Sequence, residues 1–447
     1  MDMKIKEFIK PDTLMVLTSY PTPEKGKSGK RGLNAVGWHS ERLIKELSKK
    51  RRVLVLAEKD GGKSETPVGK NTLVKRIWEK GSLRSFIRLA RFMYAQKQIK
   101  SVLIQFEFNV FGGILPNLYL LALILLLRLS GKRVSFEFHQ VILDIKLLQK
   151  HVNITNPLVQ KFYNVSLRVY YFLVGLLVNN IIVFEVELKR RLKRYVADDK
   201  IYVLSLAVEK RPFMDQKQAR ILANAHIKKG YSKIKQNEFV ILLFGFINGY
   251  KGIDWVIKQL KNSEHKNIRL LVVGGQNPYL SHKKSYQTFY NGIVTELKKH
   301  THMSYVDFVR EQDIPLFYNA ADISAIPYEV FMAASGPFSH ALSYKKPVIL
   351  SEHLEEYTNS QDIKHAMKEA HIQNADFIFK YNKKALHSMI TEIKTNPELY
   401  SKLSVFSSKL GKSRRMDKIA LKLDNILFPA FYMVRQDSPA LTKPSFA

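Results

Sequence analysis

Residues 239–254 read Phe-Val-Ile-Leu-Leu-Phe-Gly-Phe-Ile-Asn-Gly-Tyr-Lys-Gly-Ile-Asp, and this stretch is the most informative part of the chain. The apolar run 239–244 predicts a strand buried on both faces, as in parallel sheets covered by helices. The run stops at Gly245, and two further glycines flank Lys251 before a helical pattern begins at Asp254. Glycines let a phosphate approach the backbone, a helix start offers free N–H groups, and a lysine adds a full charge. The stretch therefore predicts a phosphate-binding turn, although its spacing is neither a Walker A loop nor a G-x-G-x-x-G fingerprint.

The chain is long and strongly basic. Its 447 residues are too many for one core and suit two α/β domains. The formal net charge is +33, and the first hundred residues hold 24 Lys or Arg against 10 Asp or Glu. Such a surface attracts phosphorylated substrates or acidic lipid headgroups, while a merely solvated basic surface is the plainer alternative. Nucleic acid is not an expected partner, because no binding module for it is recognisable. Cysteine is absent, so neither disulfides nor thiolate metal sites are expected.

Three segments bear on membranes. Residues 1–10 are charged and lack the apolar centre of a signal peptide. The apolar stretch 114–129 contains Pro, Asn and Arg and is too short to span a bilayer, and 170–184 is interrupted by two Asn. We interpret them as a buried helix and as a helix followed by a strand, with a helix lying on a membrane surface left open for 118–129. The expected location is cytoplasmic, with peripheral binding to the inner face of the membrane as an extension.

Strand-length apolar runs alternate with amphipathic helical patterns along the chain, which is typical of parallel sheets with helices on both faces. Strands are expected at 13–18, 52–57, 102–106, 134–138, 180–184 and 201–204, and then at 239–244, 269–273, 303–308, 322–326 and 347–350. Helices are expected at 33–49, 83–98, 187–195, 385–396, 397–409 and 415–432. We predict an α/β protein with two Rossmann-like domains facing a cleft. Residues 1–208 and 209–412 would form these two domains, and residues 413–447 would form a helix crossing back plus an unstructured tail.

Four segments, in this order and spacing, resemble the retaining GT-B glycosyltransferases of family 4, or group 1. They are the turn 245–254, the strand end Val273-Gly274-Gly275, the segments 305–309 and 314–323, and the stretch from Pro327-Tyr328 through Ser335-Gly336-Pro337 to 349. The first half is similar through the glycine-rich loop 26–32 and Phe136-Glu137-Phe138-His139. The resemblance implies a GT-B fold, with a nucleotide-diphosphate sugar bound as donor by residues 209–412 and a saccharide or lipid-linked acceptor bound by residues 1–208. It implies no required cofactor or metal, and no Asp-x-Asp metal motif is found.

The resemblance also implies roles for individual residues. Lys251 would stabilise the charge that develops on the leaving diphosphate, and His139 would contact the sugar in the transition state. The expected donor-binding residues are Gly29, Gly32, Gly245, Asn248, Gly274, Val309, Ser335, Gly336, Pro337 and His340. The plainer alternatives are a surface lysine, a packed histidine and a simple helix cap at Ser335.

The sequence departs from the family at charged positions. The arginine that precedes the lysine in relatives corresponds to Gly245 or Asn248, and the paired glutamates correspond to Met332 and His340. The expected function is transfer of a sugar with retention of configuration, in surface polysaccharide or glycolipid synthesis. A catalytically degenerate GT-B-like scaffold or binding subunit is the alternative. A nucleotide-sugar epimerase would need cleft carboxylates or a basic dyad that the sequence does not show.

Overall fold

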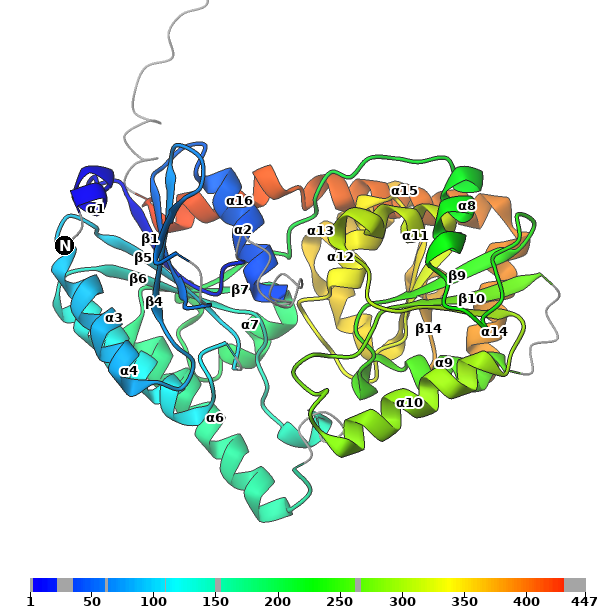
Figure 1. Ribbon diagram of the computed structural model, residues 1–447, viewed down its shortest axis with the longest axis horizontal. Coiled ribbons are helices and arrows are strands. Elements are labelled where there is room, and N and C mark those ends of the chain that lie inside the picture. Colours follow the sequence, from blue (N-terminus) through cyan, green and yellow to red (C-terminus); the bar gives the residue numbers. More distant parts are fainter. Residues whose placement is uncertain are drawn as a thin grey trace, which may run out of the picture.

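The computed structural model describes residues 3–21, 35–60, 63–108, 110–148, 154–261 and 267–429. Two β-sheets with helices on their faces form two domains that lie side by side (Figure 1). The predicted α/β class with two parallel-sheet domains is confirmed. Gly29, Gly32 and the predicted tail beyond residue 429 lie outside the described residues.

The first sheet has eight strands in the order β3-β4-β2-β1-β5-β6-β7-β8, and all neighbours are parallel except β3 and β4. The strands are β1 (Leu14–Leu17), β2 (Val53–Glu58), β3 (Glu65–Pro67), β4 (Thr72–Trp78), β5 (Ser101–Phe106), β6 (Arg133–Phe138), β7 (Asn180–Val183) and β8 (Ile201–Val203). Strands β3 and β4 were not predicted, because two basic residues interrupt the apolar pattern of β4. Arg76 is nevertheless buried, since its guanidinium donates to the carbonyl oxygens of Tyr20, Pro21 and Glu58.

Helices of the first domain cover both faces of this sheet. They are α1 (Met3–Phe8), α2 (Ala35–Leu47), α3 (Leu83–Ala95), α4 (Ile114–Leu129), α6 (Pro157–Leu177) and α7 (Val186–Leu192). The predicted helix-to-strand pair at 170–184 is confirmed as the end of α6 followed by β7. The prediction of a buried helix at 114–129 is right for one face only, because Leu120 and Ile124 are buried whereas Leu115 and Leu129 are exposed. Every helix in the described part of the chain is too short or too polar to cross a bilayer.

The second sheet is entirely parallel, with the order β11-β10-β9-β12-β13-β14. Its strands are β9 (Phe239–Phe244), β10 (Ile268–Val273), β11 (Met303–Val306), β12 (Ile323–Ile326), β13 (Val348–Ser351) and β14 (Ile378–Phe379). Its helices are α8 (Gln216–His226), α9 (Ile253–Leu260), α10 (Lys284–Lys298), α11 (Ile314–Ala320), α12 (Gly336–Ser343), α13 (Gln361–Ala370), α14 (Lys383–Thr395) and α15 (Pro397–Ser413). Strand β9 lies in the middle of the sheet, between β10 and β12, as its continuous apolar run predicts.

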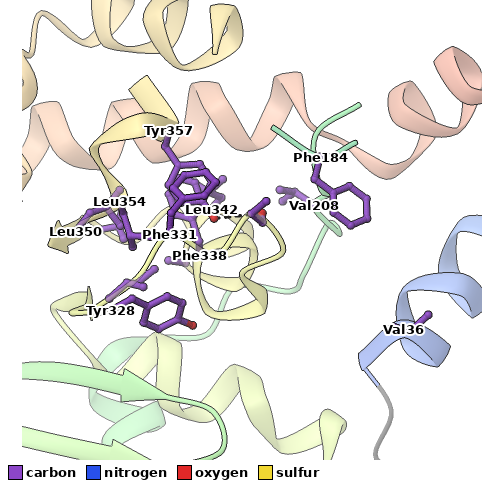
Figure 2. Packing of buried hydrophobic residues seen from close by; sticks show 14 of the residues in the cluster. Val36, Phe184, Val208, Tyr328, Phe331, Phe338, Leu342, Leu350, Leu354 and Tyr357 are labelled. Atoms are coloured by element: carbon purple, nitrogen blue, oxygen red, sulfur yellow. Dashed lines mark hydrogen bonds between the residues drawn. The ribbon is translucent and has the colours of Figure 1, made fainter. Parts of the chain in front are cut away.

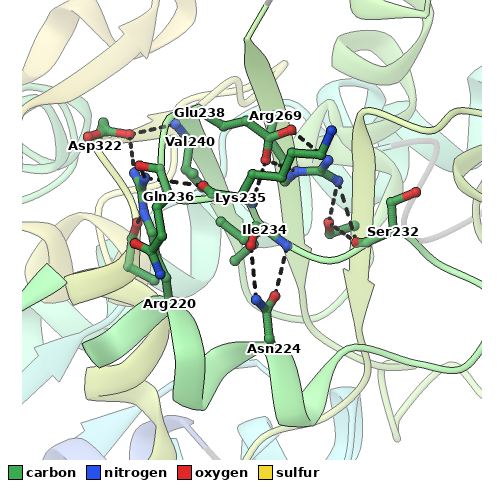
Figure 3. Close-up of polar contacts among 12 residues, drawn as sticks. Arg220, Asn224, Ser232, Ile234, Lys235, Gln236, Glu238, Val240, Arg269 and Asp322 are labelled. Carbon is green, nitrogen blue, oxygen red and sulfur yellow. Dashed lines mark hydrogen bonds and ion pairs between the residues drawn. The ribbon is translucent and has the colours of Figure 1, made fainter. Parts of the chain in front are cut away.

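Ion pairs lie at the amino-terminal ends of these central strands (Figure 3). Arg220 Nη2 lies 2.8 Å from Asp322 Oδ2, which also accepts the N–H of Val240 at 2.6 Å. Arg269 Nη2 donates to Glu238 Oε1 at 2.7 Å. The polar groups at this edge of the sheet are thus paired within the protein, which leaves the opposite, carboxyl-terminal edge for a ligand.

The chain crosses between the domains twice, and the two crossings run side by side. Val208 N donates to Arg414 O at 2.8 Å, and the buried Arg414 guanidinium pairs with Glu185 at 2.7 Å and with Asp362 at 2.6 Å. Around these crossings, apolar residues of both domains belong to one buried cluster, with the rings of Phe331 and Phe338 against Tyr357 (Figure 2). After the second crossing, α16 (Met416–Leu427) packs on α2 of the first domain. The exact boundaries at residues 208 and 412 remain predictions.

Candidate active site

The turn after β9 has a backbone that requires glycine at two places. Gly245 has φ 105° and Gly252 has φ 66°, a region that residues with a side chain rarely adopt. A Cβ atom on Gly252 would also press against the carbonyl oxygen of Pro327. Between these glycines a short 3-10 turn, Gly249–Lys251, leads directly into α9. The predicted order of strand, glycine turn, lysine and helix start is therefore present at the carboxyl end of the central strand.

Lys251 is buried in this turn, with only 7% of its surface exposed. A Cβ atom placed on Gly245 would lie 2.6 Å from Lys251 Nζ and 3.6 Å from Pro337 Cγ, so the three residues meet at one point. Among the described residues, the Lys251 ammonium has neither a hydrogen-bond acceptor nor a carboxylate partner. Burial lowers the pKa of Lys251 to about 8. Because an unpaired buried charge is costly, an anion bound beside Lys251 would be favourable, and this role of the turn remains a prediction.

The chain that follows β10 packs closely against this turn. Gly274, which follows β10, has φ 153°, and a Cβ atom there would collide with the carbonyl oxygen of Gly245. Asn248 is 5% exposed, and its Oδ1 accepts the side-chain amide of Asn277 at 3.0 Å. Gly245, Gly274 and Asn248 thus lie around Lys251, and their part in binding a donor remains a prediction.

Helix α12 begins beside the same turn. Ser335 Oγ accepts the N–H of Phe338 at 3.3 Å and donates to Tyr328 Oη at 3.4 Å, so its side chain is the helix cap. A Cβ atom on Gly336 would meet nothing within 4 Å, which shows open space at the first residue of the helix. The capping alternative thus describes the Ser335 side chain, which accepts the N–H of Phe338. Because Pro337 has no N–H and Ser339 N donates to Ser335 O, the backbone N–H that α12 offers to an anion in its first turn is that of Gly336.

His340 lies one turn further along α12. Its ring packs at 5.7 Å from the rings of Phe244 and Tyr318. Burial, followed by the positive charges of Arg42 and Arg211, lowers the pKa of His340 to about 3, so the imidazole is neutral at physiological pH. Those two arginines are held by Glu209 and Glu311, with Arg42 Nε 2.8 Å from Glu209 Oε1. A neutral imidazole can hydrogen-bond a ribose hydroxyl, which is the predicted role of His340.

Val309 follows β11 and is buried beside an aromatic pair that sequence reasoning missed. The rings of Phe246 and Phe308 stack with centroids 6.3 Å apart and planes 12° from parallel, and Phe308 is 37% exposed. Each phenylalanine comes shortly after the end of a strand, and this spacing was the only signal in the sequence. A flat apolar platform at this edge suits a nucleobase.

His139 follows β6 in the first domain and is anchored by a buried carboxylate. Its Nε2 lies 3.0 Å from Glu137 Oε1, which also accepts the side-chain amide of Gln105 at 3.0 Å and lies 3.4 Å from His39 Nε2. Burial raises the pKa of the Glu137 carboxyl, but the hydrogen bonds and charges of His139 and His39 outweigh it and hold that pKa well below its usual range. Glu137 therefore stays ionised and fixes the orientation of the His139 ring.

The same three side chains could hold a metal ion. Among the described residues, His39, Glu137 and His139 offer ligand atoms that all lie within 4.8 Å of one another. Two imidazoles and one carboxylate are a ligand set that divalent transition metals accept. The 3.0 Å contact of His139 Nε2 also fits a hydrogen bond from imidazole to carboxylate, whereas His39 Nε2 is buried without a hydrogen-bond partner among the described residues. The expectation that no metal is required remains a prediction.

Loops at the carboxyl ends of both sheets meet beside His139. Gln140 Nε2 donates to Phe331 O at 2.9 Å, and Gln140 Oε1 accepts the N–H of Ala333 at 3.3 Å. The loop that carries His139 therefore contacts the loop that leads to Ser335. Lys251, Gly245, Gly274, Pro337 and His340 gather in the second domain, and His139 approaches from the first. The described residues show no direct contact between His139 and Lys251.

Comparisons with known proteins agree with this arrangement. Residues 226–407 match the family model "Glycosyl transferases group 1". No curated protein sequence gives a significant match. A sucrose-phosphate synthase from Thermosynechococcus elongatus superposes with a TM-score of 0.68 at 14% identity, over 94% of this chain and 100% of that one. A glycosyltransferase from Rickettsia africae gives 0.62 at 13% identity, covering 94% and 98%.

A third similar structure contains ligands. Anabaena HepE, solved in complex with UDP-glucose, superposes with a TM-score of 0.60 at 14% identity, over 94% of this chain and 99% of that one. At these identities the structures show only the fold, which is GT-B. The family model identifies residues 226–407 as a group 1 glycosyltransferase domain. Assignment to family 4 remains a prediction. The chain is therefore a transferase with the GT-B fold, and its second domain is a group 1 glycosyltransferase domain.

Proposed function

We propose that this chain is a retaining glycosyltransferase of family 4. It transfers a hexosyl group from a nucleotide-diphosphate sugar to a saccharide or lipid-linked acceptor, in the synthesis of a surface polysaccharide or glycolipid. The observation that carries the proposal is the buried ammonium of Lys251, which has no anionic partner among the described residues and lies where the strand ends and a helix start converge. HepE, which was solved with UDP-glucose, makes UDP-sugars the first donors to test.

Each group around the donor has a distinct task. When the bond between the sugar and the diphosphate breaks, negative charge develops on the diphosphate, and Lys251 with the Gly336 N–H at the start of α12 stabilises it. His340 and the Phe246–Phe308 pair hold the nucleoside. His139, oriented by Glu137, hydrogen-bonds the sugar in the transition state. The acceptor binds on the first domain, whose basic charge suits a phosphorylated or membrane-bound acceptor.

No cofactor or metal is required in this mechanism, because the Lys251 ammonium and the Gly336 N–H stabilise the leaving diphosphate. Protein dialysed against EDTA should keep its turnover. This part of the proposal would be contradicted if dialysis abolished turnover and a divalent metal restored it in the wild type but not in His39→Ala.

The proposal is tested by donor binding and turnover. Thermal unfolding with UDP-, GDP- and ADP-sugars should show stabilisation by one of them, of about 2.7 kcal/mol at a hundred times the dissociation constant. Lys251→Ala should lower kcat/KM by about a hundredfold. Lys258→Ala is the matched control, because Lys258 is exposed on α9 of the same domain.

A scaffold or binding subunit is the second candidate, because Met332 and His340 stand where the family has its paired glutamates. Stabilisation by none of the nucleotide sugars would favour the scaffold. Donor binding without turnover on any acceptor would favour a binding subunit.

A further inference from the structure

Helix α6 carries an apolar stripe on its solvent side. The residues of this stripe follow one another at intervals of three or four positions, which places them on one helix face. They are Leu158, Phe162, Val165, Val169, Phe172 and Leu176, with exposures from 48% to 77%. The opposite face is already buried in the domain through Tyr170, Tyr171 and Val174. The solvent-side stripe is therefore not needed for the core of this chain.

Two neighbouring helices also carry exposed apolar side chains. Helix α6 contacts α4, and α4 contacts α3, so the three form one layer on the outside of the first sheet (Figure 1). On α4 the exposed apolar residues are Ile114, Leu115, Leu118, Leu125 and Leu129, and on α3 they are Leu83, Ile87 and Tyr94. We call this combined surface the α3–α4–α6 face. Exposed apolar side chains on three adjoining helices indicate an interaction site rather than ordinary surface.

The charge of the α3–α4–α6 face has one sign. The three helices hold six Arg or Lys residues and no Asp or Glu. On α6, Lys161 and Arg168 are exposed and each directly precedes a stripe residue. Apolar and aromatic side chains bordered by basic ones are the pattern of helices that lie in the interface of an anionic bilayer.

Other occupants fit this face less well. A second copy of the chain would bring six positive charges against six, with no carboxylate on either face to pair with them. A single partner helix could cover the stripe of α6 but would leave the exposed leucines of α4 open. We propose that the α3–α4–α6 face docks the protein on a bilayer that contains anionic lipid, with α6 lying in the plane of the interface.

The docking proposal goes beyond sugar transfer and does not require it. Helix α6 extends below both domains in Figure 1, where a flat surface can reach it. The cationic side chains beside the stripe would contact lipid phosphates while the phenylalanines enter the boundary of the acyl chains. In the proposed function, docking would bring the first domain to a lipid-linked acceptor, but binding to lipid can be measured without any donor or acceptor.

Flotation with lipid vesicles tests the apolar part of the proposal. The wild-type chain should float with vesicles of phosphatidylcholine and phosphatidylglycerol in equal parts, and binding should weaken with added salt. Phe162→Ser combined with Phe172→Ser should weaken binding at least about tenfold. Phe213→Ser is the matched control, because Phe213 is 82% exposed and lies outside the α3–α4–α6 face. Failure of the wild type to bind, or equal binding by the double variant, would overturn the proposal.

Further vesicle binding and light scattering distinguish lipid from other partners of this face. Lys161→Glu with Arg168→Glu should weaken binding to these vesicles, while Lys217→Glu, an exposed lysine on α8, should not. Vesicles of phosphatidylcholine alone should bind the wild type less than the anionic ones.

Light scattering should find the same oligomeric state for the wild type and the double phenylalanine variant. A dimer that the double variant dissociates, with no vesicle binding, would assign the face to a second copy instead. Unchanged thermal unfolding of each variant would show that it is folded, whether or not a nucleotide sugar binds.

Discussion

The ammonium of Lys251 occupies the space that a side chain on Gly245 would need. A Cβ atom on Gly245 would lie 2.6 Å from Lys251 Nζ, and the backbone there has φ 105°. The glycine at the end of β9 thus does two things at once. It permits the left-handed turn, and it leaves room for the charged end of the lysine at the strand edge where a ligand is expected.

Gly245→Ala should therefore act mainly through Lys251. The new methyl group would push the ammonium away from its position and strain the turn, so kcat/KM should fall about tenfold to a hundredfold. Stability should fall by about 1–3 kcal/mol as well. Turnover measured at varied donor concentration gives kcat/KM, and urea unfolding gives the free energy of unfolding. The control is Gly292→Ala on α10, where a Cβ atom would meet nothing within 4 Å. Equal turnover of Gly245→Ala and wild type would show that the diphosphate does not bind at this turn.

Lys251→Met should make the ligand-free protein more stable. Burial lowers the pKa of Lys251 to about 8 in the folded state, against about 10.4 in an unfolded chain. Below pH 8 the lysine is charged in both states and the folded state carries the cost of burying the charge. That cost disappears as pH rises from about 8 to about 10.4. At pH 7 the substitution should raise the free energy of unfolding by about 1–3 kcal/mol.

Urea unfolding at pH 7 and pH 9.5 checks this expectation, with Lys258→Met as the exposed control on α9. The wild type should gain stability relative to Lys251→Met between the two pH values. Donor binding should show the opposite trend, because binding a diphosphate requires the charged lysine and should weaken as pH rises above about 8. A variant that is both less stable and unchanged in donor affinity would mean that Lys251 has a purely structural role.

The sequence predicted the main strands because their residues are buried on both faces, as in β9. It also singled out His139, which directly follows β6, and Lys251, which lies in the glycine turn between β9 and α9; their roles remain predictions. It missed β3 and β4, whose apolar pattern is interrupted by Lys75 and Arg76. Other features depend on residues far apart in the chain. No pattern in the sequence indicated that His39 and Gln105 reach Glu137, or that Lys251 would be buried without a partner.

The contact between Glu137 and His139 predicts a positioning role for the carboxylate. Glu137→Gln keeps the shape of the side chain but removes the charge that orients the imidazole, so kcat should fall about tenfold to a hundredfold. The KM for the donor should change little, because Glu137 itself is buried away from the ligand. Glu398→Gln, an exposed glutamate on α15, is the control.

A double variant tests whether Glu137 acts through His139. His139→Asn should lower kcat by a similar factor, and adding Glu137→Gln to it should cause little further loss. Fully multiplicative effects would show that the carboxylate contributes independently of the imidazole, as it would if it mainly supported the fold.

The ion pair between Arg51 and Asp424 predicts how α16 holds the two domains together. Both side chains are buried, Arg51 Nη2 donates to Asp424 Oδ2 at 3.2 Å, and the guanidinium lies 3.6 Å from the centre of the Phe428 ring. Asp424→Asn would remove the buried carboxylate charge that pairs with Arg51 and should lower the free energy of unfolding by about 3–5 kcal/mol. Asp417→Asn on the same helix breaks an exposed pair with Arg415 and should change stability little.

Because α16 is the segment that returns to the first domain, hydrogen exchange in Asp424→Asn should rise in α16 and in α2, which it covers, and not in β9 or β10. Equal stability of the two variants would show that apolar contacts of α16, and not this ion pair, keep the helix in place.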